Sequence, residues 1–193
     1  LSMRNEFRKT QRANAMSTEL NLPITDAQFQ PEFARNTLQL NRGDNTYAEI
    51  AQLAGLHASE WTWASRFLDV DLDGHQDLIV TTGNESDVLD ADMLRVVADS
   101  PKTRESHFQN MMRFPSLQTP NLVFRNGGDL RFAETGTEWG FGQVGISNGM
   151  AAGDLDNDGD LDLVINNLNS PAFLLENIGS AIRIAFHLKG KSP

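Results

Sequence analysis

The chain repeats one acidic pattern, D-x-D-x-D-G-x-x-D, which reads DVDLDGHQD at residues 69–77 and DLDNDGDLD at residues 154–162. Carboxylates at the first, third and fifth positions of a tight loop converge on one point. Glycine at the sixth position permits the sharp turn because its φ can be positive. A carbonyl at the seventh position can point inward, and the ninth aspartate closes the cage. Such hard oxygen ligands suit Ca²⁺ better than Zn²⁺ or Cu²⁺, with Mg²⁺ as second choice.

Two other interpretations of these loops fit the sequence less well. A solvated acidic turn needs no ion, but four aspartates and a glycine recur here twice at identical spacing. An EF-hand requires a bidentate glutamate at position 12, where this chain has Val80 and Ile165. The residues after each loop also have the character of a strand rather than a helix. We therefore expect each ion to connect two strands of one unit.

Working outward from the loops, the chain matches itself without a gap at an offset of 85 residues. Windows 36–84 and 121–169 share 14 identical residues, which is rare between unrelated globular segments. A shorter echo between residues 122–126 and 173–177 has an offset of 51, so the longer offset contains an insertion of about 34 residues. A period near 50 residues is typical of a β-propeller or another stacked β array.

Each repeat contains four expected strands, with the acidic loop between the first and the second. Four strands per unit is the content of one propeller blade. The sequence therefore predicts a mainly β fold of propeller-type blades, about two and a half four-stranded units, with a helical insertion and an N-terminal helix. The expected strands cover residues 37–40, 46–49, 65–68, 78–82, 122–125, 131–134, 150–153, 161–165, 172–176 and 182–188.

The predicted organisation has three parts. Residues 1–30 form an N-terminal helical segment or linker, residues 31–181 hold the blades, and residues 182–193 contain the last strand. The insertion at residues 85–116 favours two helices, 91–98 with an Asp90 cap and 103–113. It is interpreted either as a cap packed on the blade or as an element that binds a partner. A closed propeller needs at least four blades, so we expect either a longer chain or pairing between chains.

Composition excludes several classes of protein. The net charge is −10, from 16 Lys and Arg against 26 Asp and Glu, and this acidic excess disfavours nucleic acid as a partner. No apolar run approaches the ~20 residues that span a bilayer. The absence of cysteine rules out disulfides, a thiol nucleophile and thiolate metal sites.

The acidic loops resemble the calcium loops of FG-GAP/VCBS repeats, the blade units of integrin-α-type propellers. The longer pattern, N-x-x-x-x-N-x-G-D followed by Ala-Glu and the acidic loop, resembles secreted bacterial proteins of the ASPIC/UnbV group and cartilage acidic protein of animals. The resemblance covers about residues 30–193, and the segment from residue 182 onward is similar to the opening of an ASPIC/UnbV domain.

The resemblance implies two calcium sites and a specific set of ligands. His75 and Asp160 would contribute their backbone carbonyls. The implied metal residues are Asp69, Asp71, Asp73, His75 and Asp77 in the first loop, and Asp154, Asp156, Asp158, Asp160 and Asp162 in the second.

The sequence leaves two classes of function open. The first is a non-enzymatic, calcium-stabilised propeller segment for binding or scaffolding, located outside the cell, at the cell surface or in the periplasm, because calcium outside the cytosol can reach the millimolar range that weak sites need. Its ligand would be a protein or a carbohydrate. The second is an enzyme that acts on extracellular glycans, with Glu49, Glu134 and Glu138 as candidate acids. Glu49 and Glu134 occupy the same repeat position, which favours a structural role. Fold alone cannot decide between these classes.

Overall fold

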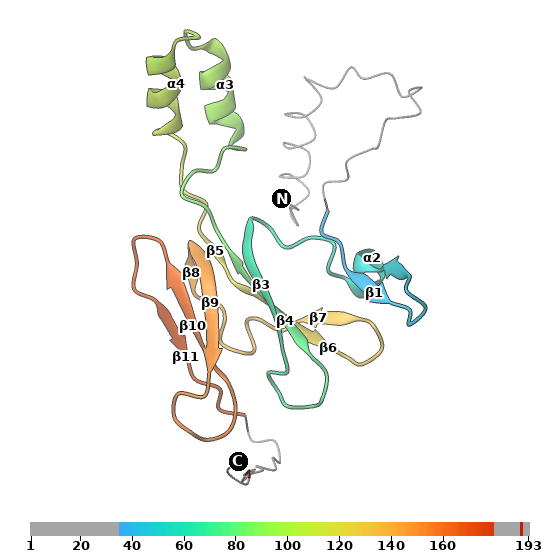
Figure 1. Cartoon of the computed structure of the whole chain (residues 1–193). Coiled ribbons are helices and arrows are strands. Elements are labelled where there is room, and N and C mark those ends of the chain that lie inside the picture. Colours follow the sequence, from blue (N-terminus) through green and yellow to red (C-terminus); the bar gives the residue numbers. More distant parts are fainter. Residues whose placement is uncertain (1–34, 180–189, 191–193) are drawn as a thin grey trace.

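The computed structural model describes residues 35–179 and residue 190 of the chain (Figure 1). Strands make up 34% and helices 14% of the structure, so the fold is mainly β, as predicted. The strands are β1 Gln39–Asn41, β2 Tyr47–Glu49, β3 Thr62–Leu68, β4 Asp77–Thr82, β5 Thr119–Pro120, β6 Leu122–Asn126, β7 Phe132–Glu134, β8 Val144–Gly145, β9 Ser147–Gly153, β10 Asp162–Asn167 and β11 Phe173–Leu175. The helices are α2 Ala51–Ala54, α3 Ala91–Asp99 and α4 Arg104–Met111.

The central sheet has four antiparallel strands in the order β3-β4-β6-β7, which is also their order in the sequence. The β9-β10-β11 sheet repeats its first three strands, and the β1-β2 hairpin repeats its last two. This is the predicted repeat of short antiparallel strands. The predicted fourth strand at 182–188 and the N-terminal helix lie outside the described residues.

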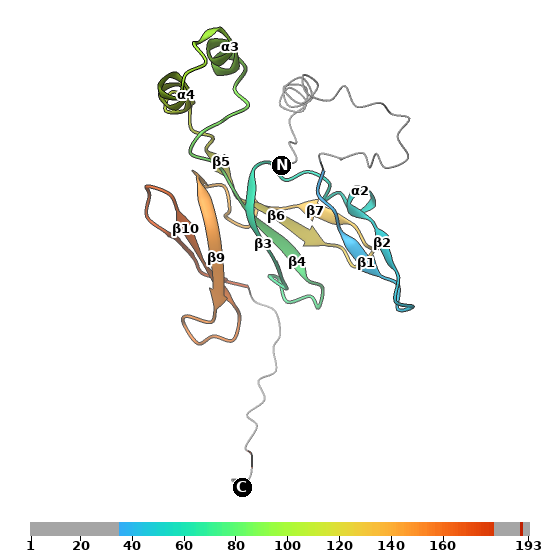
Figure 2. The ribbon, with the colours of Figure 1, turned by 45° about the horizontal axis from the view of Figure 1, so that its top comes forward.

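The three sheets lie side by side, and apolar side chains fill the two spaces between them (Figures 1 and 2). One core, built around Val80, Leu122 and Phe124, receives Leu56 from the segment after α2. The second core joins Ile79 and Val123 of the central sheet to Ile165 of β10. Because strand residues alternate between the two faces, successive residues of β4 point into different cores. Within the described part of the chain no sheet closes into a ring, so the propeller remains a proposal.

Two elements were not expected from the sequence. The short helix α2 follows β2, where Glu49 Oε1 accepts a hydrogen bond from the backbone N–H of Ala51 at 2.8 Å. This bond lowers the pKa of Glu49, together with the nearby Arg35 guanidinium. The two-residue pair β5–β8 connects the chain just before β6 with the chain just before β9. Glu49 thus has a structural contact at the start of a helix.

The insertion forms the two helices that the sequence predicts. The Asp90 side chain accepts a hydrogen bond from the N–H of Met93 at 2.9 Å and caps α3, and Thr103 caps α4 in the same way. The helices contact each other, and both views show the hairpin extending away from the sheets (Figures 1 and 2). Of the two interpretations of the insertion, the cap packed on the blade therefore differs from the structure, and the partner-binding element stays a prediction. In agreement with this, Phe108 and Met112 of α4 are exposed and do not pack against a sheet.

The base of the hairpin is closed by paired backbone. Asn84 and Leu117 exchange two backbone hydrogen bonds of 2.8 Å each, and the N–H of Asp87 donates to the carbonyl of Pro115 at 2.7 Å. Asp87 and Leu117 are buried at this base. The two ends of the insertion therefore lie next to each other, independent of the helices beyond them.

We expect the helices to be dispensable for the acidic loops. Replacing residues 89–113 with a short Gly/Ser turn should leave calcium binding and the melting temperature almost unchanged, because the paired base is retained. Replacing all of residues 85–116 is the matched control, and it should lower the melting temperature because it removes the buried Phe114 and Asp87. Calorimetric titration and thermal melts measure both. Loss of calcium binding in the shorter replacement would contradict the expectation.

Candidate metal centres

The first acidic loop lies between β3 and β4. Asp69 follows directly after β3, and its two carboxylate oxygens each accept a 3.0 Å hydrogen bond, from the N–H groups of Asp73 and Gly74. In the second loop Asp154 follows β9 and accepts in the same way from Asp158 at 3.2 Å and Gly159 at 3.1 Å. The two loops therefore fold alike, around the carboxylate of their first aspartate.

The backbone of each loop enters the left-handed region twice. Gly74 has φ +90° and Gly159 has φ +94°, as the sharp turn at the sixth position requires. The fourth position is also left-handed, with φ 56° at Leu72 and φ 64° at Asn157. Asparagine tolerates this conformation, whereas for leucine it is strained.

Exchanging the two fourth-position residues should move stability in opposite directions. Leu72→Asn should stabilise the chain by about 1 kcal/mol because it relieves the left-handed strain, and Asn157→Leu should destabilise it by a similar amount. Urea unfolding of both variants measures this. Equal signs for the two substitutions would show that side-chain burial, not backbone conformation, decides this position.

The ninth aspartate of each loop connects three segments of chain. Asp77 is fully buried; Oδ2 accepts from the N–H of Val70 at 3.0 Å and Oδ1 from the N–H of Asn126 at 2.8 Å. Burial raises the pKa of Asp77 above its ordinary value, and the neighbouring Asp71 and Asp73 carboxylates add to the rise, while the two backbone hydrogen bonds oppose it. A bound cation would offset that repulsion and favour the charged carboxylate.

Asp162 makes the equivalent contacts in the second loop. It accepts from the N–H of Leu155 at 2.8 Å and from the N–H of Asn177 at 2.9 Å, and it is also buried. The ninth aspartate therefore connects its loop to the C-terminal end of the third strand in both repeats, to the last residue of β6 in the first and to the second residue after β11 in the second.

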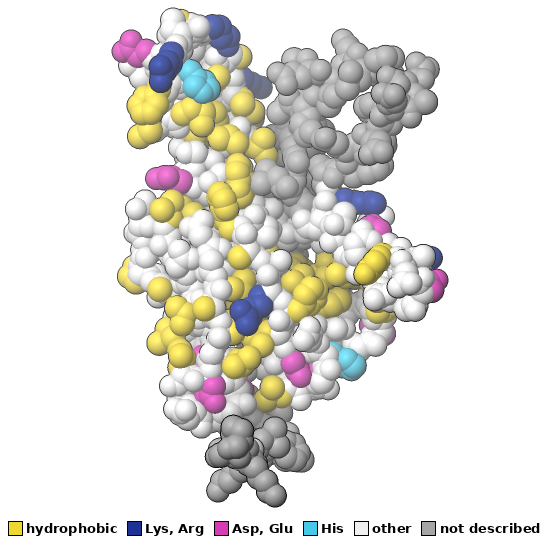
Figure 3. All heavy atoms as spheres, viewed as in Figure 1, with side chains coloured by type: hydrophobic (Ala, Val, Ile, Leu, Met, Phe, Trp, Pro, Cys, Tyr) yellow, Lys and Arg dark blue, Asp and Glu magenta, His cyan; other side chains and the backbone are white. Residues whose placement is uncertain are grey.

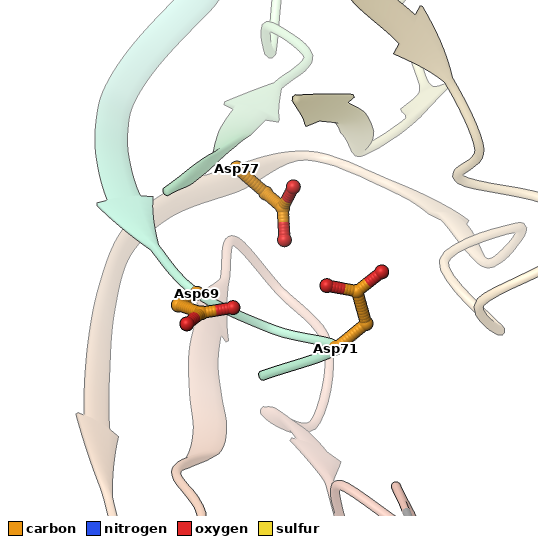
Figure 4. A group of neighbouring side chains, drawn as sticks. All are labelled: Asp69, Asp71 and Asp77. Atoms are coloured by element: carbon orange, nitrogen blue, oxygen red, sulfur yellow. The ribbon is translucent and has the colours of Figure 1, made fainter. Parts of the chain in front are cut away.

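In each loop, three of the predicted carboxylates come together. Asp69, Asp71 and Asp77 offer oxygens that all lie within 4.8 Å of one another, and so do Asp154, Asp156 and Asp162. In Figure 4, the Asp71 and Asp77 carboxylates point toward each other across the loop, with Asp69 beside them. Oδ1 of Asp71 is buried and has no hydrogen-bond partner among the described residues. An all-oxygen, anionic donor set with a buried oxygen of this kind fits a hard divalent cation.

The other predicted residues lie outside these triads. Asp73 accepts from the N–H of His75 at 2.9 Å, and Asp158 accepts from the N–H of Asp160 at 3.1 Å. His75 is exposed and its ring lies against Gly128, whereas Asp160 is buried. Their roles as ligands stay predictions.

Arg125 of β6 is a site residue that the sequence analysis missed. Its Nε lies 2.6 Å from Oδ2 of Asp71, and its Nη2 lies 2.8 Å from Oδ2 of Asp73. The hydrogen bond to Asp71 and the negative charges around it raise the pKa of Arg125. The repeat comparison could not find this residue because Arg125 has no basic counterpart in the second unit.

Two asparagines at the ends of the third strands were also missed, Asn126 as the last residue of β6 and Asn177 two residues after β11, although the sequence echo contains both. Oδ1 of Asn126 accepts from Gly128 N–H, and Oδ1 of Asn177 accepts from Gly179 N–H, both at 3.0 Å. The Asn177 amide also donates to the carbonyl of Val70 at 2.8 Å. Because Asn177 binds Asp162 and Val70 binds Asp77, a chain of hydrogen bonds connects the two acidic loops.

Comparison with known families supports the repeat. An FG-GAP-like repeat is found at residues 114–165, a span that includes β6, β7, β9 and the whole second acidic loop. A search of curated proteins finds no match. In the described part of the chain, no helix has the length and apolar character that crossing a membrane requires.

Proposed function

We propose that this chain is a calcium-binding segment of a β-propeller, part of a secreted, surface or periplasmic protein that serves in binding or scaffolding. The observation that carries the proposal is the recurrence of one acidic triad at the same place in two sheets, between the first and second strands. FG-GAP repeats often bind calcium and are typical of extracellular or surface proteins. Millimolar calcium outside the cytosol would fill such sites.

In this proposal each ion is held by the three triad carboxylates, with further oxygens from the predicted set of each loop. The ion supplies positive charge that balances the clustered carboxylates. The chain's own residues hold the loop in position: the first aspartate organises its backbone, and the ninth connects it to the C-terminal end of the third strand. The consequence is a rigid connection between strands of one sheet.

The outer face of the β9-β10-β11 sheet supports a propeller. Ile79 and Val123, on the corresponding face of the central sheet, are fully buried against the β9-β10-β11 sheet. Their repeat equivalents Val164 and Leu174 are 36% and 68% exposed. Figure 3 shows hydrophobic side chains reaching the surface over the β10–β11 region. In a propeller, another blade would cover this face as the β9-β10-β11 sheet covers the central one.

The finer division of the chain is part of the same proposal. Residues 1–30 would be a helical segment or linker, residues 31–181 the blades with the insertion 85–116, and residues 182–193 the last strand and the start of an ASPIC/UnbV-like segment. The proposed partner is a protein or a carbohydrate of unspecified identity.

A calorimetric titration tests the calcium sites. We expect two equivalents of calcium to bind the wild-type chain and one to bind Asp156→Ala. That variant loses a triad carboxylate whose only described hydrogen bond is a 3.2 Å contact with the N–H of Asp158. Asn166→Ala, outside both loops, is the matched control and should keep both equivalents. No binding at millimolar calcium would return the loops to solvated acidic turns.

A second candidate function is an enzyme that acts on glycans. The observation in its support is a cavity of about 650 Å³ between the central sheet and the β9-β10-β11 sheet. Glu138, Trp139 and Glu176 line it together with leucines. Carboxylates and aromatic rings lining one cavity are the residue types that bind and cleave sugars. Polysaccharide cleavage that is lost in Glu138→Gln would favour this candidate over scaffolding.

A further inference from the structure

At the strand position equivalent to Arg125, the β9-β10-β11 sheet has an acidic residue. Phe124 of β6 pairs with Leu78, the residue after the first loop, and Leu175 of β11 pairs with Leu163, the residue after the second. The next residues along the third strands are Arg125 and Glu176. The two sheets therefore place opposite charges at equivalent positions.

Arg125 forms two ion pairs with the first loop, one with Asp71 and one with Asp73. Its guanidinium is permanently charged. The two aspartate side chains are 27% exposed and the arginine 43%, so the pairs are partly shielded from water. One oxygen of a triad carboxylate, Oδ2 of Asp71, is thus already bound to a cation of the protein itself, while Oδ1 stays buried beside it.

The charge around the two loops differs accordingly. The first loop has four aspartates and the Arg125 cation, a formal charge of −3. The second loop has five aspartates, because Asp160 stands where the first has His75, a formal charge of −5, and Glu176 at the strand position equivalent to Arg125 adds a negative charge where the central sheet has a positive one. A divalent cation would be attracted more strongly to the second loop.

We propose that Arg125 makes the two calcium sites unequal: it is an internal counter-ion that weakens calcium binding at the first site, so the second site fills at lower calcium concentration. This inference rests on the proposed function, since it concerns the affinity of the same two sites. It also assigns Arg125 a role without calcium, because the guanidinium holds two carboxylates of the first loop together.

Single-site backgrounds measure each affinity separately. Asp156→Ala leaves the first site, in which Arg125→Gln should strengthen calcium binding about tenfold. This is the effect that one charge about 6 Å from a divalent ion has even at the dielectric constant of water. Arg125→Lys should stay near the wild-type affinity because the charge is kept. Raising the salt concentration should narrow the difference between Arg125→Gln and wild type.

The reverse change provides the matched control. Asp69→Ala leaves the second site, in which Glu176→Arg should weaken calcium binding about tenfold or more, and Glu176→Gln should have a smaller effect. This arm does not depend on Arg125 variants folding. Titration calorimetry gives the affinities, and thermal melts verify that each variant is folded.

The outcomes separate this inference from the proposed function. Equal calcium affinities at the two sites would overturn the inference, and so would a lower affinity of the first site in Arg125→Gln. Either result would leave the calcium sites themselves in place. Weakening would show that the arginine positions ligands instead of competing with the ion. Absence of binding in the wild-type chain and in both backgrounds would overturn the proposed function itself.

Discussion

Chelation of calcium should lower the melting temperature of this chain by about 10 °C or more. An ion that binds only the folded chain stabilises it by about 2.7 kcal/mol per site when its concentration is 100 times Kd. Two sites then contribute about 5 kcal/mol, and each kcal/mol corresponds to about 2–4 °C in a chain of this size. Thermal melts with calcium and with excess chelator measure the shift.

Variants and a second ion make this measurement specific. Asp71→Ala combined with Asp156→Ala should melt at the same temperature with and without chelator, because both triads have lost a carboxylate. Magnesium should restore less of the stability than calcium, since it requires a stricter octahedral geometry. A wild-type melting curve that ignores the chelator would contradict the stabilising role of the ion.

The second large effect concerns the core between the central sheet and the β9-β10-β11 sheet. Ile79→Ala should lower the free energy of unfolding by about 2–5 kcal/mol, because Ile79 is fully buried and the substitution leaves a cavity. Val164→Ala, at the repeat-equivalent position, should cost less than about 1 kcal/mol because Val164 is 36% exposed. Urea unfolding of both variants measures the difference.

A third variant controls for side-chain size. Val123→Ala removes the same two methyl groups as Val164→Ala, but from a fully buried position in the same core as Ile79. We expect its loss of stability to exceed that of Val164→Ala clearly. Equal losses would mean that the outer face of β10 is covered in the folded 193-residue chain.

The repeated features of the fold could be predicted from the sequence. The acidic loops and the repeat period of about 50 residues predict the strands of the central sheet and of the β9-β10-β11 sheet to within a few residues, because each loop fixes where one strand ends and the next begins. Asp90 marked the start of α3 because a capping aspartate has a direct effect on the backbone N–H groups of the first turn. The triads contain only residues that the pattern had singled out.

The unrepeated features could not be predicted. Arg125 acts through a contact with Asp71, 54 positions earlier in the chain, and no local pattern indicates such a contact. The left-handed backbone at Leu72 is a property of the folded loop. In the sequence, the only sign of it is that Asn157, a residue that tolerates this conformation, stands at the equivalent position of the second loop. The α2 helix and the β5–β8 pair are too short to produce a hydrophobic period in the sequence. Their formation depends on the sheets around them.

The long connection between β4 and β6 has a consequence for the order of folding. It contains 39 residues, whereas five residues connect β10 with β11. For flexible loops, this difference adds about 1.8 kcal/mol to the entropy cost of bringing the strands together. We therefore expect the β9-β10-β11 sheet to pair first and the central sheet to be completed only after the hairpin base has closed. The second acidic loop would then be able to take up its ion while the first is still being assembled.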